Sequence, residues 1–215
     1  MADTTHNHLP ILFVLGGTFN PFHNGHLAAL NHLHKQFPYA RIHILPNRKP
    51  VHKQNLTHHS HRTLMLSQTL DQGYITIDHT DIDLPQENYT LYTLQALRKK
   101  WPHSSLAWVM GDDVFHSIET WGNWEELLNY AHFYLLPRTQ PAYSSSLLHA
   151  LQKYDGSMNE LHQKTHGYTI FDNQFSPLDI SSSDIRRLIT QNQPISHLVP
   201  EKVAIYIQKH RLYLP

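Results

Sequence analysis

The chain contains 215 residues, 40% of them hydrophobic, and its 17 basic and 17 acidic residues give a formal net charge of zero. Sequence-independent binding of nucleic acid requires an excess of basic residues, so the composition argues against that function. It contains no cysteine, so disulfides, thiolate metal sites and thiol catalysis are excluded, and no apolar run approaches the roughly 18 residues that span a bilayer. We therefore predict a cytoplasmic protein without nucleic-acid or membrane partners, folded as a single domain over residues 11–215 behind a flexible extension at residues 1–10.

The first predicted elements form a strand, a turn, a helix and a second strand. Residues 11–15 (ILFVL) are a short apolar run that ends at Gly16, which is typical of a buried strand. From His26 leucines recur at helical spacing, and this helix ends before Pro38. Residues 42–45 form the next strand. A unit of this kind predicts a parallel sheet.

The alternation continues to the end of the chain. Further strands are predicted at residues 74–77, 106–110, 132–136 and 168–171. Further helices are predicted at residues 62–70, 92–100, 124–129, 183–190 and 200–210. The fold class is therefore α/β, a Rossmann-like doubly wound parallel sheet with C-terminal helices. Long connections at residues 47–60 and 81–89 follow strands, where α/β folds carry their function.

The turn after the first strand has the composition of an anion site. It reads Gly16-Gly17-Thr18-Phe19-Asn20-Pro21-Phe22-His23-Asn24-Gly25-His26. Two glycines let the backbone approach a ligand without a Cβ in the way, and the helix N-terminus near His26 directs free N–H groups to the same place. His23 and His26 add two imidazoles that donate to phosphate oxygens. The turn matches neither a Walker A loop nor a Gly-x-Gly-x-x-Gly fingerprint.

A second anion site is predicted near the C-terminus. Residues 180–187 read Ile-Ser-Ser-Ser-Asp-Ile-Arg-Arg, and a serine run before a helical pattern signals a helix N-cap. Serine hydroxyls at a helix N-terminus, with Arg186 one turn into the helix, also suit phosphate. The residues alone leave open whether the run only caps the helix or binds phosphate as well.

Together the two motifs resemble those of the nucleotidyltransferase superfamily that carries the His-x-Gly-His signature. The resemblance implies that His23, His26 and Arg186 are catalytic and stabilise the triphosphate as pyrophosphate leaves. It also implies that ATP is bound by Gly16, Gly17, Thr18, Phe19, Gly111, Asp113, Ile180 and Ser183.

Several further segments resemble the nicotinate-nucleotide adenylyltransferases within that superfamily. They are Pro46-Asn47 with His52-Lys53, Arg62 with Met65-Leu66, Asn88-Tyr89-Thr90 with Thr93-Leu94, Met110-Gly111-Asp112-Asp113, and Trp121. The mononucleotide contacts that the resemblance implies are Asn47, Lys53, Arg62, Thr90 and Trp121. The resemblance runs from about Ile11 to Tyr213. It departs at residues 137–141, where Arg-Pro-Gly is usual, and at Asn88 and Asn20, where serine and aspartate are frequent.

The reaction that the resemblance implies is adenylyl transfer from ATP to nicotinate mononucleotide, giving nicotinate adenine dinucleotide and pyrophosphate in NAD biosynthesis. The attacking phosphate is already anionic at neutral pH, so positioning and charge neutralisation should carry catalysis without a protein base. Mg²⁺ bound with ATP is the expected cofactor, with no metal site of the protein's own. We expect a monomer or a small homo-oligomer.

Three alternatives remain open. Pantetheine-phosphate adenylyltransferases and cytidylyltransferases share the His-x-Gly-His signature, and a non-catalytic nucleotide sensor can keep the fold, although it would be expected to lose a histidine or the arginine. The 20 histidines, among them His6, His8, His58, His59 and His61, also suggest a metal-binding protein. We interpret them as a solvated terminus and loop because none has familiar zinc-ligand spacing. The residues alone do not distinguish an acid from an amide substrate.

Overall fold

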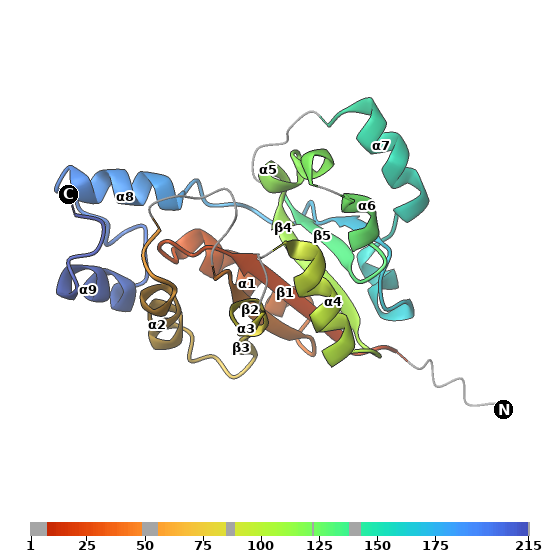
Figure 1. Cartoon of the computed structure of the whole chain (residues 1–215), viewed down its shortest axis with the longest axis horizontal. Coiled ribbons are helices and arrows are strands. Elements are labelled where there is room, and N and C mark those ends of the chain that lie inside the picture. The colour runs from red at the N-terminus through yellow and green to blue at the C-terminus, as the bar shows by residue number, and fades with distance from the viewer. Residues whose placement is uncertain (1–7, 49–55, 85–88, 122, 138–142, 215) are drawn as a thin grey trace.

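A six-stranded parallel sheet forms the centre of the protein (Figure 1), in a computed structural model that describes residues 8–48, 56–84, 89–121, 123–137 and 143–214. The strand order is β3-β2-β1-β4-β5-β6, and every neighbouring pair runs parallel. The strands are β1 (Ile11–Gly17), β2 (Arg41–Pro46), β3 (Ile75–Ile77), β4 (Ser105–Gly111), β5 (His132–Leu136) and β6 (Thr169–Phe171). This order is that of a doubly wound Rossmann sheet, so the predicted fold class is confirmed.

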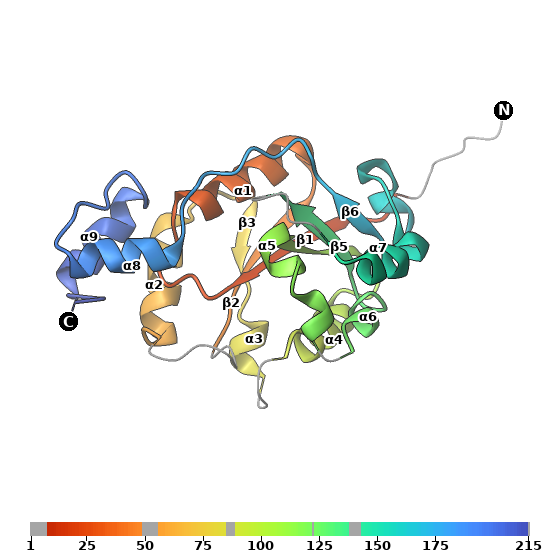
Figure 2. The ribbon, with the colours of Figure 1, turned by 90° about the horizontal axis from the view of Figure 1, so that it is seen from above.

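Helices cover both faces of the sheet, as Figure 2 shows, with α1 on one side and α4 and α6 on the other. The helices are α1 (Asn24–Gln36), α2 (His59–Thr69), α3 (Thr80–Asp83), α4 (Thr90–Lys100), α5 (Asp112–Phe115), α6 (Trp124–Leu127), α7 (Ser145–Leu151), α8 (Ser182–Thr190) and α9 (Glu201–Lys209). Three 3₁₀ turns are η1 (Ile118–Thr120), η2 (Gln152–Tyr154) and η3 (Met158–Gln163). Among the described residues no helix is long and apolar enough to cross a membrane.

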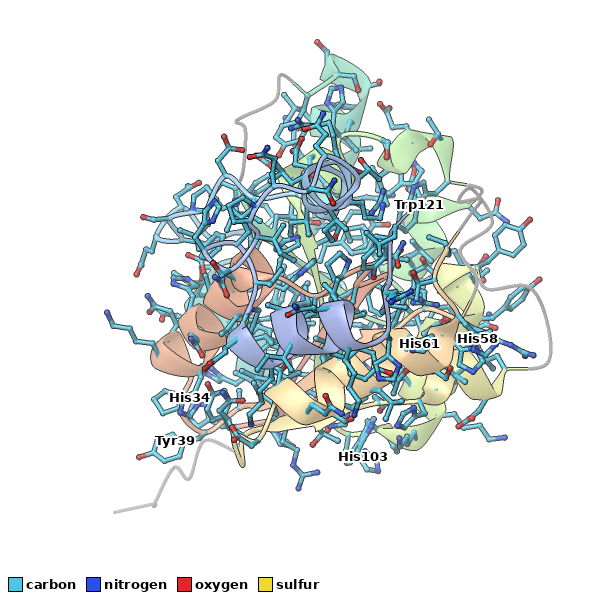
Figure 3. The ribbon with its side chains drawn as sticks, turned by 90° about the vertical axis from the view of Figure 1, so that its left-hand side faces the viewer. His34, Tyr39, His58, His61, His103 and Trp121 are labelled. Atoms are coloured by element: carbon cyan, nitrogen blue, oxygen red, sulfur yellow. The ribbon has the colours of Figure 1, made fainter. Side chains whose placement is uncertain are left out.

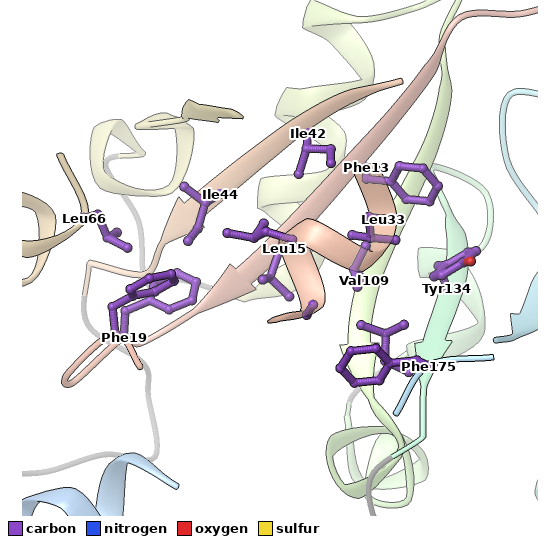
Figure 4. Close-up of a cluster of buried hydrophobic side chains, with 14 of the residues drawn as sticks. Phe13, Leu15, Phe19, Leu33, Ile42, Ile44, Leu66, Val109, Tyr134 and Phe175 are labelled. Carbon is purple, nitrogen blue, oxygen red and sulfur yellow. The ribbon is translucent and has the colours of Figure 1, made fainter. Parts of the chain in front are cut away.

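Two hydrophobic cores lie on the two faces of the sheet because strand side chains alternate in direction. Phe13 and Leu15 of β1 enter the first core with α1 and α2, whereas Leu12 and Val14 enter the second core with α4 and α7. Figure 4 shows the first core, in which Leu33 of α1 packs onto β1 and β2. Burial on both faces explains why the strands appear in the sequence as continuous apolar runs.

The structure differs from the predicted elements mainly at short helices. Three short helices, α3, α5 and α7, and the three 3₁₀ turns were not predicted, because segments of three to seven residues show too little periodicity. Helix α1 begins at Asn24, two residues before His26, since His23 is its N-cap residue with extended φ −143° and ψ 171°. Residues 1–7 of the predicted extension lie outside the described residues. Leu9, within the extension, donates its N–H to the His162 carbonyl at 3.0 Å.

Candidate active site

The sheet topology determines where the first predicted anion motif and the Gly111 turn lie. Strand β1 lies between β2 and β4, and the strand order reverses between β1 and β4. In open α/β sheets the carboxyl ends of the strands at such a reversal form the ligand crevice. The first motif begins at Gly16 and Gly17, which end β1, and the Gly111 turn follows β4. Both therefore lie at the crevice.

The second motif docks directly onto the first. The Arg186 guanidinium donates to the Asn20 carbonyl at 2.8 Å and to Ser183 Oγ at 3.1 Å. Ser182 Oγ donates to the Pro21 carbonyl at 2.9 Å. Two helix N-termini, those of α1 and α8, are thus joined through loop carbonyls although they lie far apart in the sequence. The helix N-cap predicted for this serine run is confirmed, because Ser181 Oγ accepts from the Asp184 N–H at the start of α8.

The C-terminal segment holds the same turn from another side. Tyr213 donates its hydroxyl to Asn20 Oδ1 at 3.0 Å, and burial raises the pKa of Tyr213 to about 12. The Asn24 N–H donates to the Leu198 carbonyl at 2.9 Å, and its Nδ2 donates to the His197 carbonyl at 3.1 Å. These contacts give a structural reason for the family resemblance to extend as far as Tyr213.

His23 and His26 form a stacked pair at the start of α1. Their ring centroids are 3.6 Å apart, and the His26 ring also stacks on Phe22 at 5.5 Å. His23 is 2% exposed, and its main-chain N–H donates to Nδ1 of the His26 ring at 3.2 Å. Because Nδ1 of His26 accepts, the proton of the neutral ring is on Nε2, which makes Nε2 the donor for a ligand oxygen.

The glycines of the first motif have a packing role that the sequence did not reveal. A Cβ on Gly16 would lie 2.5 Å from the Trp108 ring, and one on Gly17 would lie 2.8 Å from the Phe19 ring. A Cβ on Gly25 would lie 3.1 Å from the His23 ring. Close approach of these rings to the backbone therefore requires glycine, in addition to the predicted approach of a ligand.

Arg62 is fully buried, at 0% exposure, and its guanidinium binds main-chain oxygens. The guanidinium donates to four carbonyls at 2.6–3.0 Å, those of Thr18, Asn47, Arg48 and Thr57. Burial lowers the pKa of Arg62, and the negative charge of Asp81 opposes this effect. The guanidinium therefore holds main-chain segments in place, and the contact with the mononucleotide that the resemblance implies stays a prediction.

Asp81 is a buried carboxylate that the sequence analysis missed. It accepts from Thr93 Oγ1 at 2.7 Å and from the Arg48 N–H at 3.0 Å, and it is 4% exposed. It thereby ties the segment after β2 to α4. Its place in the long connection after β3 was the available signal, but a carboxylate in a connection is usually solvated.

The remaining predicted site residues are distributed around the same end of the sheet. Thr90 is the first residue of α4, and half-buried Trp121 follows η1 and packs against the second core. Asp113 is exposed in α5, the helix that begins directly after Gly111. The Ile180 carbonyl would lie 3.8 Å from a Cβ on Gly25, which places Ile180 at the first motif. Lys53, Asn88 and residues 138–141 lie outside the described residues.

The histidines at residues 58–61, which we interpreted as part of a solvated loop, lie instead at the start of helix α2. His61 Nδ1 lies 2.9 Å from the Tyr206 hydroxyl, and its ring lies 5.4 Å from that of His210, so it joins α2 to α9. His58 caps α2 by accepting from the Ser60 N–H. Figure 3 shows His58 and His61 near one end of α2. No group of three or more His, Asp or Glu side chains that could hold a metal ion occurs within the part of the chain that the structure describes.

Comparisons with known proteins agree with this architecture. The cytidylyltransferase-like family matches residues 14–188. A protein of Pseudoalteromonas atlantica named "Probable nicotinate-nucleotide adenylyltransferase" is 36% identical over 211 residues, covering 96% of each chain, and one of the same name from Marinomonas sp. is 34% identical, covering 94% of each. The solved Plasmodium falciparum nicotinic acid mononucleotide adenylyltransferase complexed with NaAD has the same fold, with a TM-score of 0.73 at 21% identity over 95% of this chain and 97% of that one.

Proposed function

The chain belongs to the cytidylyltransferase-like family and, within it, to the nicotinate-nucleotide adenylyltransferases, and we propose that it transfers the adenylyl group of ATP to nicotinate mononucleotide. A phosphate oxygen of the mononucleotide attacks the α-phosphorus of ATP. The new phosphoanhydride bond forms as the bond from the α-phosphorus to the bridging oxygen breaks. Nicotinate adenine dinucleotide and pyrophosphate are the products, as NAD biosynthesis requires.

The observation that carries this proposal is the convergence of His23, His26 and Arg186 on one turn. Each brings an N–H donor, and Arg186 brings a fixed positive charge, where two helix N-termini meet. Negative charge builds up on the leaving pyrophosphate in the transition state. Preorganised donors therefore stabilise the transition state more strongly than the ground state. The attacking phosphate is anionic at neutral pH, so no protein base removes a proton from it.

Packing fixes these donors before substrate arrives. The His26 ring stacks on both His23 and Phe22, and its Nδ1 accepts from the main-chain N–H of His23, so the proton of the neutral ring is on Nε2, where it can be donated to a phosphate oxygen. Arg186 is held by the Asn20 carbonyl and Ser183 Oγ. Rigid donors of this kind are the usual source of rate enhancement in phosphoryl and nucleotidyl transfer.

Magnesium enters this proposal as part of the MgATP substrate. Mg²⁺ prefers hard oxygen ligands such as carboxylates, whereas the donors around the first motif are imidazole, hydroxyl and guanidinium groups. The triphosphate oxygens therefore hold the ion, which neutralises part of their charge when it is bound. His23, His26, Ser183 and Arg186 bind the remaining oxygens.

The mononucleotide lies, in this proposal, between the segment after β2 and the start of α4. Asn47, Thr90, Trp121 and Lys53 supply its contacts, while Arg62 and Asp81 hold the Asn47 segment in place. The names of the curated relatives favour the acid over the amide mononucleotide and over phosphopantetheine. We also infer a cytoplasmic location, in keeping with small soluble substrates.

Labelled ATP tests this proposal. The protein is mixed with ATP labelled with ³²P at the α-position and nicotinate mononucleotide, and the products are separated by chromatography. The expected result is label in the dinucleotide, with an equal amount of unlabelled pyrophosphate. Label that remains in ATP despite tight ATP binding would instead identify a nucleotide sensor.

A further inference from the structure

A hollow of about 470 Å³ lies at the β2–β3 edge of the sheet, away from the two motifs. Its walls include Arg41, His43, Tyr74, Thr76, Lys100 and Trp101. Arg41 begins β2, Tyr74 precedes β3, and Trp101 follows α4. These are the amino ends of the strands, opposite the crevice that serves catalysis. The volume is in the range of small-molecule sites, and the adenylyl transfer reaction does not account for it.

The charge of the hollow favours an anion. Lys100 Nζ and the Arg41 guanidinium lie over the Trp101 ring at 5.9 and 5.2 Å from its centroid. None of the described residues that line the hollow carries a carboxylate. One carboxylate lies behind the wall, that of buried Asp78, which accepts from Lys100 Nζ at 3.1 Å and from His43 Nδ1 at 2.9 Å. Two permanent cations thus face one carboxylate, so an anionic ligand completes the balance.

The residues that line the hollow also include flat rings and Trp101, whose indole N–H is unpaired within the described part of the chain. Trp101 Nε1 is buried and has no hydrogen-bond acceptor among the described residues. Buried donors are nearly always paired, so such an atom calls for a partner that a ligand can supply. The rings of Tyr74 and His43 lie in the same wall. Aromatic rings with cations beside them are the combination that binds a base together with its phosphate.

We propose that this hollow is a second, regulatory site for a mononucleotide, with the phosphate on Arg41 and Lys100 and an acceptor of the base or ribose on Trp101 Nε1. Because the site lies at the opposite end of the strands, its occupant does not compete with ATP. Arg41 and Lys100 have exposed side chains, which makes their cations reachable from solvent.

A chain of contacts links this site to the mononucleotide segment of the active site. Asp78 also accepts from the Thr80 N–H at 2.9 Å, and Thr80 begins the short helix α3 that carries Asp81. Asp81 holds the Arg48 N–H and the Thr93 hydroxyl. A phosphate that draws Lys100 from Asp78 therefore acts on the element that fixes the segment after β2. This coupling rests on the proposed function, whereas binding at the hollow does not.

The indole signals of the four tryptophans test the site directly. The protein labelled with ¹⁵N is titrated with adenosine monophosphate, and the Trp101 indole signal is assigned from a Trp101→Phe variant. We expect the Trp101 signal to move downfield and saturate in wild-type protein. Arg41→Glu should abolish the movement, whereas Lys99→Glu, an exposed charge on α4 outside the hollow, should leave it unchanged.

Two outcomes overturn the site. Either only Trp121 or Trp124 responds, which places the nucleotide in the active site alone, or the Trp101 shift persists in Arg41→Glu. A separate measurement tests regulation. At saturating adenosine monophosphate the KM for nicotinate mononucleotide should change by about 5-fold or more in wild type and not in Arg41→Glu. An unchanged KM with a saturating Trp101 shift removes the regulatory role, while absent turnover in all samples refutes the proposed function instead.

Discussion

Replacing Arg62 by methionine keeps an unbranched apolar stem in the buried position and removes the guanidinium donors. In the native structure four main-chain carbonyls, those of Thr18, Asn47, Arg48 and Thr57, accept from this guanidinium. Each buried hydrogen bond to a charged group contributes about 1.5–3 kcal/mol, but the four are not additive. Removal of one partner from a buried charged arrangement costs about 3–5 kcal/mol. We therefore expect Arg62→Met to lower the free energy of unfolding by about 3–5 kcal/mol.

This loss converts to a fall in Tm of about 6–20 °C for a chain of this size, measured by circular dichroism at fixed pH. The same variant should also lower kcat/KM for nicotinate mononucleotide by about 10–100-fold, because an error of about 1 Å in positioning has effects of that order. Kinetics are measured well below the new Tm, so that all of the protein is folded. Arg62→Lys retains the charge and should have intermediate effects.

Arg98 provides the matched control. It is also an arginine whose guanidinium donates to main-chain carbonyls, among them those of Tyr130 at 2.8 Å, Ser104 at 2.8 Å and Thr165 at 2.6 Å. These carbonyls surround the amino ends of β4 and β5, away from the crevice. Arg98→Met should lower Tm by a similar amount with kcat/KM nearly unchanged.

A purely positioning role of Arg62 is refuted if Arg62→Met loses mononucleotide affinity while its Tm stays at the wild-type value. That result would mean that Arg62 contacts the substrate directly. Equal kinetic effects of Arg62→Met and Arg98→Met would also refute it, because destabilisation alone would then explain the loss.

Three further predictions concern the histidine pair, His132 and Gly16. His23→Ala and His26→Ala should each lower kcat by about 10²-fold or more with an unchanged circular dichroism spectrum, whereas His61→Ala should retain turnover; near-normal turnover of the double variant would contradict the role. Burial lowers the pKa of His132 to about 4, so the unfolded state binds more protons between pH 6.5 and 4. Stability is therefore present above pH 6.5 and falls by about 3 kcal/mol as pH drops to 4; His132→Gln should flatten this part of the urea-unfolding profile, and parallel profiles would speak against it. Gly16→Ala places a Cβ 2.5 Å from the Trp108 ring and should cost about 1–3 kcal/mol, while Gly73→Ala, with no atom within 4 Å, should not lower Tm; equal Tm values for the two would disprove the clash.

The sheet and the long helices could be predicted because burial leaves a periodic signature in the sequence. Leu12 to Leu15 are apolar without interruption since both faces of β1 are covered. In the sequence, only a shared ligand implied that the two motifs lie together. The structure shows a direct contact between them, the hydrogen bond from the Arg186 guanidinium to the Asn20 carbonyl.

Features that depend on distant partners could not be predicted. The sequence around Arg62 resembles that of a ligand-binding arginine, and nothing local indicates that carbonyls from separate segments converge on its guanidinium. Likewise Gly16 must be glycine because of Trp108, a residue of another strand. Short helices such as α3 owe their existence to such contacts, here the Thr80 N–H on Asp78, and not to their own propensity.

The central claim is that nicotinate mononucleotide is the adenylyl acceptor. The most direct test is the rate of pyrophosphate release from MgATP with nicotinate mononucleotide, nicotinamide mononucleotide or phosphopantetheine supplied separately. The account predicts a kcat/KM for nicotinate mononucleotide well above those for the other two. A preference for either of the others would contradict our assignment of the acceptor, and release that is the same without any acceptor would contradict adenylyl transfer itself.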